Sequence, residues 1–252
     1  MNIKSLKKWS NITRSWPQVV LVKVGLKKDV INLTMHNGLN LLLMNRGEHS
    51  DTSVVSDIYF NTPYTKDDFE IQDNWLVLDV GANVGVFSTY VVKQAKNVKV
   101  YAYEPAKDNF DFLNNNIKRN NLTTNIKAFN VAVTGKEGKK INLYIHSLGS
   151  GGNSLYHEQA KSDKTETVLT TSLNEIIKLN KISNVDLLKL DCEGAEFDIL
   201  LNSSKNVLSK IRRVAIETHE VNGHSVKELQ KFLNTHGFKT YINSQNILCG
   251  TK

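Results

Sequence analysis

Short apolar runs alternate with amphipathic segments from residue 75 almost to the end of the chain. This alternation is typical of a parallel β-sheet whose strands are joined by crossover helices. The apolar runs predict strands at residues 75–80, 98–103, 126–132, 185–191 and 211–217. The segments between them predict helices at residues 84–95, 106–120, 172–180 and 195–202. We therefore expect an α/β domain.

The C-terminal part of the sequence predicts a different connection. A helix at residues 225–236 precedes two β-prone runs, 238–242 and 246–249, which are separated by residues 243–245 alone. So short a link cannot form a parallel crossover, and the two strands should form an antiparallel hairpin. The expected architecture is a mostly parallel seven-stranded sheet with an antiparallel C-terminal hairpin.

The region before residue 73 differs from the rest. Residues 30–35 and 39–44 are β-prone runs on either side of Asn37-Gly38, a pair that favours a type I′ hairpin turn. Residues 47–65 are polar and mixed, with one short helix expected around residues 53–60. We divide the chain into a basic N-terminal section with a β-hairpin, residues 1–72, and a main domain, residues 73–252.

The formal net charge of +7 arises from the first 28 residues, which contain seven basic side chains and no acidic one. The rest of the chain carries 25 basic and 25 acidic residues, so the main domain is formally neutral. The basic section could contact an anionic membrane surface, an acidic substrate or a phosphate backbone, or it could be a solvated helix that aids solubility.

The apolar runs and the cysteines indicate the cellular compartment of the protein. No apolar run approaches the roughly 20 residues that a membrane-spanning helix needs, and the N-terminus lacks the apolar core of a signal peptide. A cytoplasmic protein is expected, with the basic section as the part that could reach a membrane surface. Cys192 and Cys249 are too few for a disulfide framework and lack zinc-site spacing, so both are expected to be reduced and buried.

The strongest chemical signal follows the first strand of the predicted sheet. Asp79, Gly81, Asn83 and Gly85 alternate in the turn before the next helix. Glycine lets a backbone approach a ligand closely, and a helix N-terminus presents free N–H groups with about half a positive charge. A dinucleotide fingerprint would need glycine at position 83 and different spacing after it. The pattern instead resembles motif I of class I methyltransferases, with asparagine in place of their frequent middle glycine.

An acid at the end of the second strand supports this interpretation. Glu104 lies 25 residues after Asp79 and precedes Pro105, which stops the strand and opens a helix. Its carboxylate could accept hydrogen bonds from both ribose hydroxyls of an adenosine, or it could stabilise the helix dipole by about 0.3–1 kcal/mol. The turn upstream favours ribose binding.

Several ordered motifs together resemble one family. Residues 189–196 (KLDCEGAE), with DVGANVG, YEP, NVAV at 130–133 and IETH at 216–219, are similar to the FkbM-type methyltransferases over about residues 73–242. The resemblance implies a Rossmann-like class I methyltransferase fold and S-adenosyl-L-methionine as cofactor. It also implies O-methylation of a hydroxyl on a carbohydrate, glycoconjugate or related metabolite. The expected cofactor-binding residues are Asp79, Gly81, Ala82, Asn83, Gly85, Glu104, Pro105 and Ala132.

Four residues that follow the fourth and fifth strands are candidate catalytic residues. Asp191 and Glu193 could orient the acceptor hydroxyl, favour the positive sulfonium or ligate a divalent metal, although no metal site is assigned. Glu193, like Glu196, could equally serve the helix N-terminus. Glu217 and His219 leave the fifth strand on the same side. A histidine with a pKa near about 6.5 can take a proton at neutral pH, so His219 is the expected general base.

A glycine-rich loop at residues 146–154 follows a further β segment at 141–145. Extra material at this point of an α/β chain usually lies over the carboxyl edge of the sheet, where ligands bind. In the family that the chain resembles, a serine-rich stretch lies near the substrate. This implies an acceptor-binding role for Ser150, Asn153 and Ser154.

Two other functions stay open. RNA or DNA methylation is suggested by the basic section and by residues 61–64 (NTPY), which faintly resemble the Asn-Pro-Pro-Tyr signature of amino-methyltransferases. That signature belongs at the end of the fourth strand, so residues 61–64 are interpreted as a loop and no nucleic-acid partner is expected. A non-catalytic binding protein on the same fold would require a damaged cofactor motif, and the sequence shows none.

Overall fold

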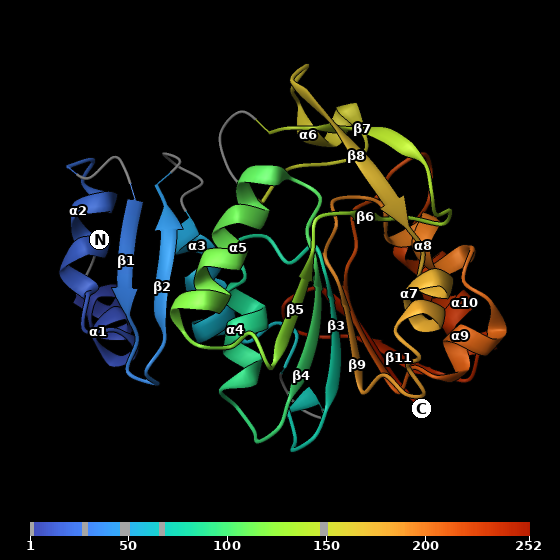
Figure 1. The fold of residues 1–252 in the computed structure, drawn as a ribbon, viewed down its shortest axis with the longest axis horizontal. Helices are drawn as coiled ribbons and strands as arrows, with labels where there is room; N and C mark the ends of the chain where they lie inside the picture. Colours follow the sequence, from blue (N-terminus) through green and yellow to red (C-terminus); the bar gives the residue numbers. More distant parts are fainter. Residues whose placement is uncertain (1–2, 27–29, 46–50, 66–68, 147–150) are drawn as a thin grey trace.

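The fold is known from a computed structural model, which describes residues 3–26, 30–45, 51–65, 69–146 and 151–252. Seven strands form the central sheet in the order β11-β12-β10-β9-β3-β4-β5 (Figure 1). They are β3 (Leu76–Val80), β4 (Lys99–Tyr103), β5 (Ile126–Phe129), β9 (Leu187–Leu190), β10 (Arg213–Glu217), β11 (Lys239–Ile242) and β12 (Ile247–Thr251). β12 pairs antiparallel with β10 and β11, and the other neighbours are parallel. The predicted sheet is confirmed.

Consecutive residues of the central strands face opposite sides of the sheet, and each side has its own apolar core. Val77 belongs to the cluster under α4 (Val86–Val92) and α5 (Lys107–Arg119), whereas Leu78 belongs to the cluster on the other face. Four helices cover that second face, namely α7 (Leu173–Leu179), α8 (Glu196–Leu201), α9 (Lys205–Ser209) and α10 (Val226–Thr235). The mostly apolar sequences of the inner strands result from this burial on both faces.

The N-terminal section packs on the α4–α5 side (Figure 1). It contains α1 (Ile3–Ile12), α2 (Trp16–Lys23), the predicted hairpin of β1 (Val30–Thr34) and β2 (Asn40–Met44), α3 (Asp51–Ser56) and the π-helix η1 (Asp57–Asn61). Asn116 of α5 accepts a hydrogen bond from Leu42 N (2.6 Å) and donates one to Leu42 O (2.9 Å). The exposed edge of β2 is thereby paired. Within the described ranges, no helix has the length and apolar character to cross a membrane.

A second sheet lies over the carboxyl ends of the central strands (Figure 1). It has the order β6 (Ala132–Val133), β8 (Thr165–Thr171), β7 (Lys140–Tyr144), and α6 (His157–Ala160) lies beside it. The strand predicted over 126–132 is wrong in extent, because the Asn130 amide donates to the carbonyls of Glu104 and Pro105 and the chain leaves the sheet there. β8 was not predicted, since its threonine-rich sequence has no continuous apolar run.

Candidate active site

A cavity of about 390 Å³ lies at the carboxyl ends of the parallel strands, within the range of about 300–1,000 Å³ typical of small-ligand sites. The predicted site residues that line it are Gly81, Ala82, Asn83, Glu104, Pro105, Ala132, Asn153, Asp191, Glu193 and Glu217. The described candidates outside the lining are Asp79, Gly85, Ser154 and His219. Ser150 lies outside the described residues.

The two glycines of the β3–α4 turn are required by packing within the chain. Gly81 has φ +77°, and a Cβ there would lie 1.7 Å from the backbone oxygen of Asp191. Gly85 has φ +84°, and a Cβ there would lie 2.5 Å from Leu113 Cδ1. The sequence predicted close approach of a ligand at both positions, but the space at each is filled by the protein itself. Gly81 additionally lines the cavity.

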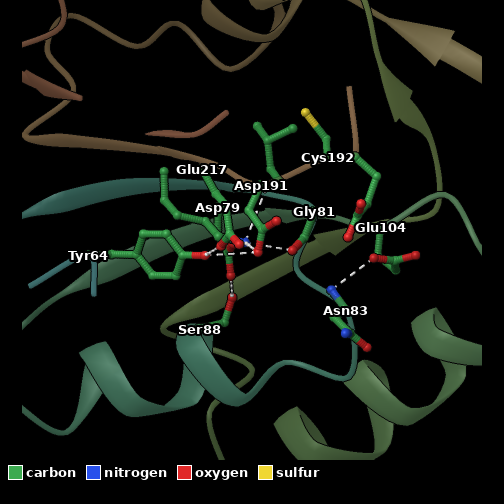
Figure 2. Close-up of polar contacts among 12 residues, drawn as sticks. Tyr64, Asp79, Gly81, Asn83, Ser88, Glu104, Asp191, Cys192 and Glu217 are labelled. Atoms are coloured by element: carbon green, nitrogen blue, oxygen red, sulfur yellow. Dashed lines mark hydrogen bonds and ion pairs between the residues drawn. The ribbon is translucent and has the colours of Figure 1, made fainter. Parts of the chain in front are cut away.

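A buried ion pair holds this turn against β9. Asp79 is fully buried and Lys189 is 3% exposed, with Lys189 Nζ 3.2 Å from Asp79 Oδ1. The ammonium also donates to Gly81 O (2.7 Å), and Asp79 Oδ2 accepts a hydrogen bond from Ser88 Oγ (2.6 Å) (Figure 2). Burial lowers the pKa of Lys189, but the charges of Asp79 and Asp191 outweigh it and raise the pKa. Lys189 is therefore a cation, and Asp79 acts by holding it.

Tyr64 brings two carboxyl groups together. Its hydroxyl lies 3.0 Å from Asp191 Oδ2 and 2.5 Å from Glu217 Oε2 (Figure 2). Its ring packs edge-on against Phe87 with 5.5 Å between the ring centroids, and Pro63 O accepts a hydrogen bond from Asn243 Nδ2 (2.9 Å). The loop after η1 thus supplies a buried side chain to the ends of β9 and β10.

The contacts among Tyr64, Asp191 and Glu217 raise the pKa values of Tyr64 and Glu217. Burial, followed by the charges of Asp191 and Glu217, raises the pKa of Tyr64 well above its ordinary value. The charge of Asp191, followed by burial, raises the pKa of Glu217. Lys189 Nζ lies 3.5 Å from Asp191 Oδ2 and stabilises negative charge on that carboxylate. Of the two acids, Glu217 is the one that favours holding a proton.

His219 is held between two acids just outside the cavity. Its Nδ1 lies 3.1 Å from Glu196 Oε1, and its Nε2 lies 3.4 Å from Glu193 Oε2. Burial lowers the pKa of His219, but the hydrogen bond that its Nδ1 donates to Glu196 and the negative charges of Glu193, Glu196 and Asp191 raise it to about 10. The imidazole is therefore protonated at neutral pH, which argues against its predicted role as a general base.

Glu193 and the backbone beside it are held by His219, Ser154 and Glu196. Burial raises the pKa of Glu193 to about 7, and the positive charge of His219 opposes this rise. Ser154 Oγ donates to Glu193 O (2.5 Å), so Ser154 positions the backbone of Glu193. Glu196 accepts hydrogen bonds from Cys192 N (3.0 Å) and Gly194 N (3.0 Å), so of the two acids it is Glu196 that serves the helix N-terminus.

Glu104 lies at the other end of the cavity from Tyr64 (Figure 2). Its carboxylate accepts hydrogen bonds from Asn83 N (2.8 Å) and Ala106 N (3.0 Å). Burial raises its pKa to about 7 against these hydrogen bonds. The β3–α4 turn and the acid that ends β4 therefore form one continuous polar surface.

The charge of the lining favours a cationic ligand. Among the described lining residues, five carry a carboxyl group and Lys189 is the one ammonium. The five are Asp57, Glu104, Asp191, Glu193 and Glu217. A dinucleotide would place its pyrophosphate among these acids, whereas a sulfonium or ammonium group would be attracted by them.

The family model described as the methyltransferase FkbM domain matches residues 79–240. This range covers more than half of the chain and includes the β3–α4 turn, Glu104 and Asp191. The chain belongs to the FkbM methyltransferase family. It is an S-adenosylmethionine-dependent methyltransferase, as the sequence motifs predicted.

Known relatives of this FkbM-family protein differ in what they act on. It is 25% identical to 31-O-demethyl-FK506 methyltransferase FkbM of Streptomyces tacrolimicus, over 89% of this chain and 95% of that protein. It is 24% identical to hexuronic acid methyltransferase AglP of Haloferax volcanii, over 70% of this chain and 69% of that protein. It is 25% identical to AMB antimetabolite synthetase AmbE of Pseudomonas aeruginosa over 85% of this chain, which spans 11% of that protein's length. The match identifies the family but not the acceptor.

Three residues of this FkbM-family site could ligate a metal ion. Donor atoms of Asp191, Glu217 and His219 all lie within 4.8 Å of one another. A cation would have to take the proton's place on His219 and displace the Tyr64 hydroxyl from both carboxyl groups. It would also lie close to the ammonium of Lys189. Lys189, Tyr64 and the proton on His219 therefore already compensate the negative charge of these carboxylates.

Sequence reasoning missed the roles of Lys189 and Tyr64 and misjudged Cys192. Lys189 carried a detectable signal, because a lysine inside an apolar central strand must be paired. Tyr64 carried none, since its loop reaches Asp191 only through the fold. Cys192 was expected to be buried but is half-buried and lines the cavity. Burial raises the pKa of its thiol well above the ordinary value.

Proposed function

We propose that this protein transfers a methyl group from S-adenosylmethionine to a hydroxyl group of a carbohydrate or glycoconjugate. The main observation behind this proposal is the cavity. Glu104 lies at one end of it, and Asp191 and Glu217 are held together by Tyr64 at the other. The names of two relatives, one a hexuronic acid methyltransferase and one a 31-O-demethyl-FK506 methyltransferase, support O-methylation.

Glu104 and its neighbours would hold the donor. The Glu104 carboxylate has lone pairs left for ribose hydroxyls after its two backbone bonds. Pro105, Ala132 and Leu143 line the cavity nearby and offer apolar contact for an adenine ring. When bound, S-adenosylmethionine supplies an electrophilic methyl group on a positively charged sulfur. The acids of the lining then favour that charge near Asp191.

The acceptor would enter from the N-terminal side of the cavity. Asp57 and Asn61 of η1 line it, as do Asn153, which lies between β7 and α6, and Gln245 of the C-terminal hairpin. Amide and carboxyl groups pair well with the many hydroxyls of a sugar, because each can donate or accept hydrogen bonds. This lining extends the predicted acceptor-binding role of Asn153 to residues of η1.

Proton transfer would use the Tyr64 cluster. The Tyr64 phenol has one hydrogen but contacts two carboxyl groups, so both contacts are hydrogen bonds only when one carboxyl is protonated. We assign that proton to Glu217, whose pKa is raised by the charge of Asp191, and Lys189 Nζ lies 3.5 Å from Asp191 Oδ2. Asp191 is then the base that accepts the acceptor's hydroxyl proton. His219, as an imidazolium, positions Glu193.

The acceptor class can be tested with methyl-labelled cofactor and a panel of sugar nucleotides, oligosaccharides and glycolipids. We expect label on a sugar oxygen with the wild type and none with Asp191→Asn. Mixed RNA serves as the comparison acceptor. Label found in RNA and in none of the sugars would replace this proposal with the nucleic-acid alternative.

Donor affinity should depend on pH through Glu104. The pKa of Glu104 is about 7, and only its carboxylate can accept from both ribose hydroxyls. The dissociation constant for S-adenosylmethionine should therefore rise by up to about tenfold per pH unit below 7 and level off above it. Titration calorimetry between pH 6 and pH 8 measures this slope.

Glu193 has a similar pKa at the other end of the cavity and provides the matched control. Glu104→Gln should bind the donor weakly and with a much shallower slope, whereas Glu193→Gln should keep most of the slope. The reverse pattern would show that the ribose of the donor does not bind at Glu104.

Activity should not require a divalent metal, because Lys189 and the proton on His219 already balance the acids. Methyl transfer measured after dialysis against a chelator should equal that of the untreated protein. A loss that added Mg²⁺ restores would instead assign Asp191, Glu217 and His219 as ligands.

A further inference from the structure

Exposed apolar side chains gather in the N-terminal section. Of the nine large apolar side chains that are exposed in the described part of the chain, six lie between residues 3 and 30. They are Ile3 (84% exposed), Trp16 (38%), Leu21 (42%), Val24 (57%), Leu26 (76%) and Val30 (38%). Contiguous exposed apolar surface on a protein marks a contact site more often than scattered residues do.

Helix α2 is the centre of this surface. Its sequence, WPQVVLVK, has one charged residue, Lys23, at its last position. Val19 and Val22 face the core, while Trp16, Leu21 and the C-cap residue Val24 are exposed. A helix on the surface of a soluble domain normally has a polar outer face. The outer face of α2 is instead apolar.

Basic side chains lie on α1, on α2 and between the two helices. Lys4 and Lys7 are exposed on the side of α1 opposite the buried Trp9, together with Ile3. Lys8, Arg14 and Lys23 are also exposed, and residues 1–28 contain no acid. Both helices lie at the end of the molecule farthest from α9 and α10 (Figure 1). Apolar and basic groups without acids form a surface complementary to anionic lipid.

We propose that α1 and α2 dock on a bilayer that contains anionic phospholipid. The exposed apolar side chains of α2 and Ile3 enter the headgroup region, and the lysines and Arg14 contact lipid phosphates. A second copy of this chain fits the surface less well, because a two-fold interface would bring two acid-free basic sets together. The inference is independent of the acceptor proposed above.

Vesicle co-sedimentation of the full chain tests the proposal. We expect binding to mixed phosphatidylcholine and phosphatidylglycerol vesicles, little binding to phosphatidylcholine alone, and weaker binding at high salt. The double variants Leu21→Glu/Val24→Glu and Lys4→Glu/Lys7→Glu should each bind mixed vesicles at least about tenfold more weakly.

Leu179→Glu is the matched control, since Leu179 is 69% exposed at the end of α7 and should be neutral. Donor affinity, measured for every variant, verifies that the fold and the site are intact. Equal sedimentation of the wild type and Leu21→Glu/Val24→Glu would overturn the proposal. A solution dimer that this variant dissociates would overturn it too, in favour of a second copy.

Discussion

Asp191→Asn should lower the rate of methyl transfer by about 100- to 10,000-fold. Asp191 lies at the cavity with its Oδ2 3.0 Å from the Tyr64 hydroxyl and 3.5 Å from Lys189 Nζ. Asparagine keeps the shape of the side chain but cannot accept the proton of the acceptor hydroxyl. Single-turnover rates with labelled cofactor measure the loss without a contribution from product release.

The fold should tolerate this change, because the close contact with Gly81 involves the backbone oxygen of residue 191 and not its side chain. Tyr64→Phe is a milder change in the same cluster of side chains. It removes the hydroxyl shared by Asp191 and Glu217 and should lower the rate less than Asp191→Asn does. Full activity of Asp191→Asn would mean that another group is the base. An unchanged melting transition of the variant would show that a loss of activity comes from the chemical step and not from unfolding.

Lys189→Met should destabilise the protein by about 3–5 kcal/mol, because it leaves Asp79 as an unpaired charge in the core. Asp79 is fully buried, and Lys189 is the cation beside it at 3.2 Å. Methionine fills a similar volume, so the loss comes from charge and not from a cavity. Urea unfolding followed by circular dichroism measures the change in the free energy of unfolding.

The double variant Asp79→Asn/Lys189→Met separates this effect from simple misfolding. Removing both charges should restore much of the stability that Lys189→Met loses, since the buried carboxylate is gone. Lys127→Met, at a position on β5 where the side chain is exposed, should be nearly neutral. If Lys189→Met cost no more than Lys127→Met, Asp79 would not depend on this ion pair.

The central sheet could be predicted from the sequence because its inner strands, β3, β9 and β10, are largely buried on both faces and so are mostly apolar. Val77, Leu78 and their neighbours on β9 form a clear local signal of this kind. β8 lacks such a signal, because exposed and buried positions alternate along most of its length. The break after Phe129 depends on hydrogen bonds from Asn130 to another strand end, which no local pattern contains.

The candidate site was predictable where its residues end strands of the parallel sheet. Asp191 and Glu104 directly follow β9 and β4, and Glu217 is the last residue of β10. The carboxyl ends of parallel strands meet at one edge of the sheet. The protonation of His219 was not predictable, because it depends on Glu193 and Glu196 together. Tyr64 was not predictable either, since it lies 127 residues before Asp191 and reaches it from η1.

A crystal structure of the protein soaked with S-adenosylhomocysteine would test the placement of the donor most directly. We expect both ribose hydroxyls within hydrogen-bond distance of the Glu104 carboxylate and the sulfur at the end of the cavity beside Asp191. A ribose bound away from Glu104, or a sulfur pointing away from Asp191 and Glu217, would contradict the assignment of these residues.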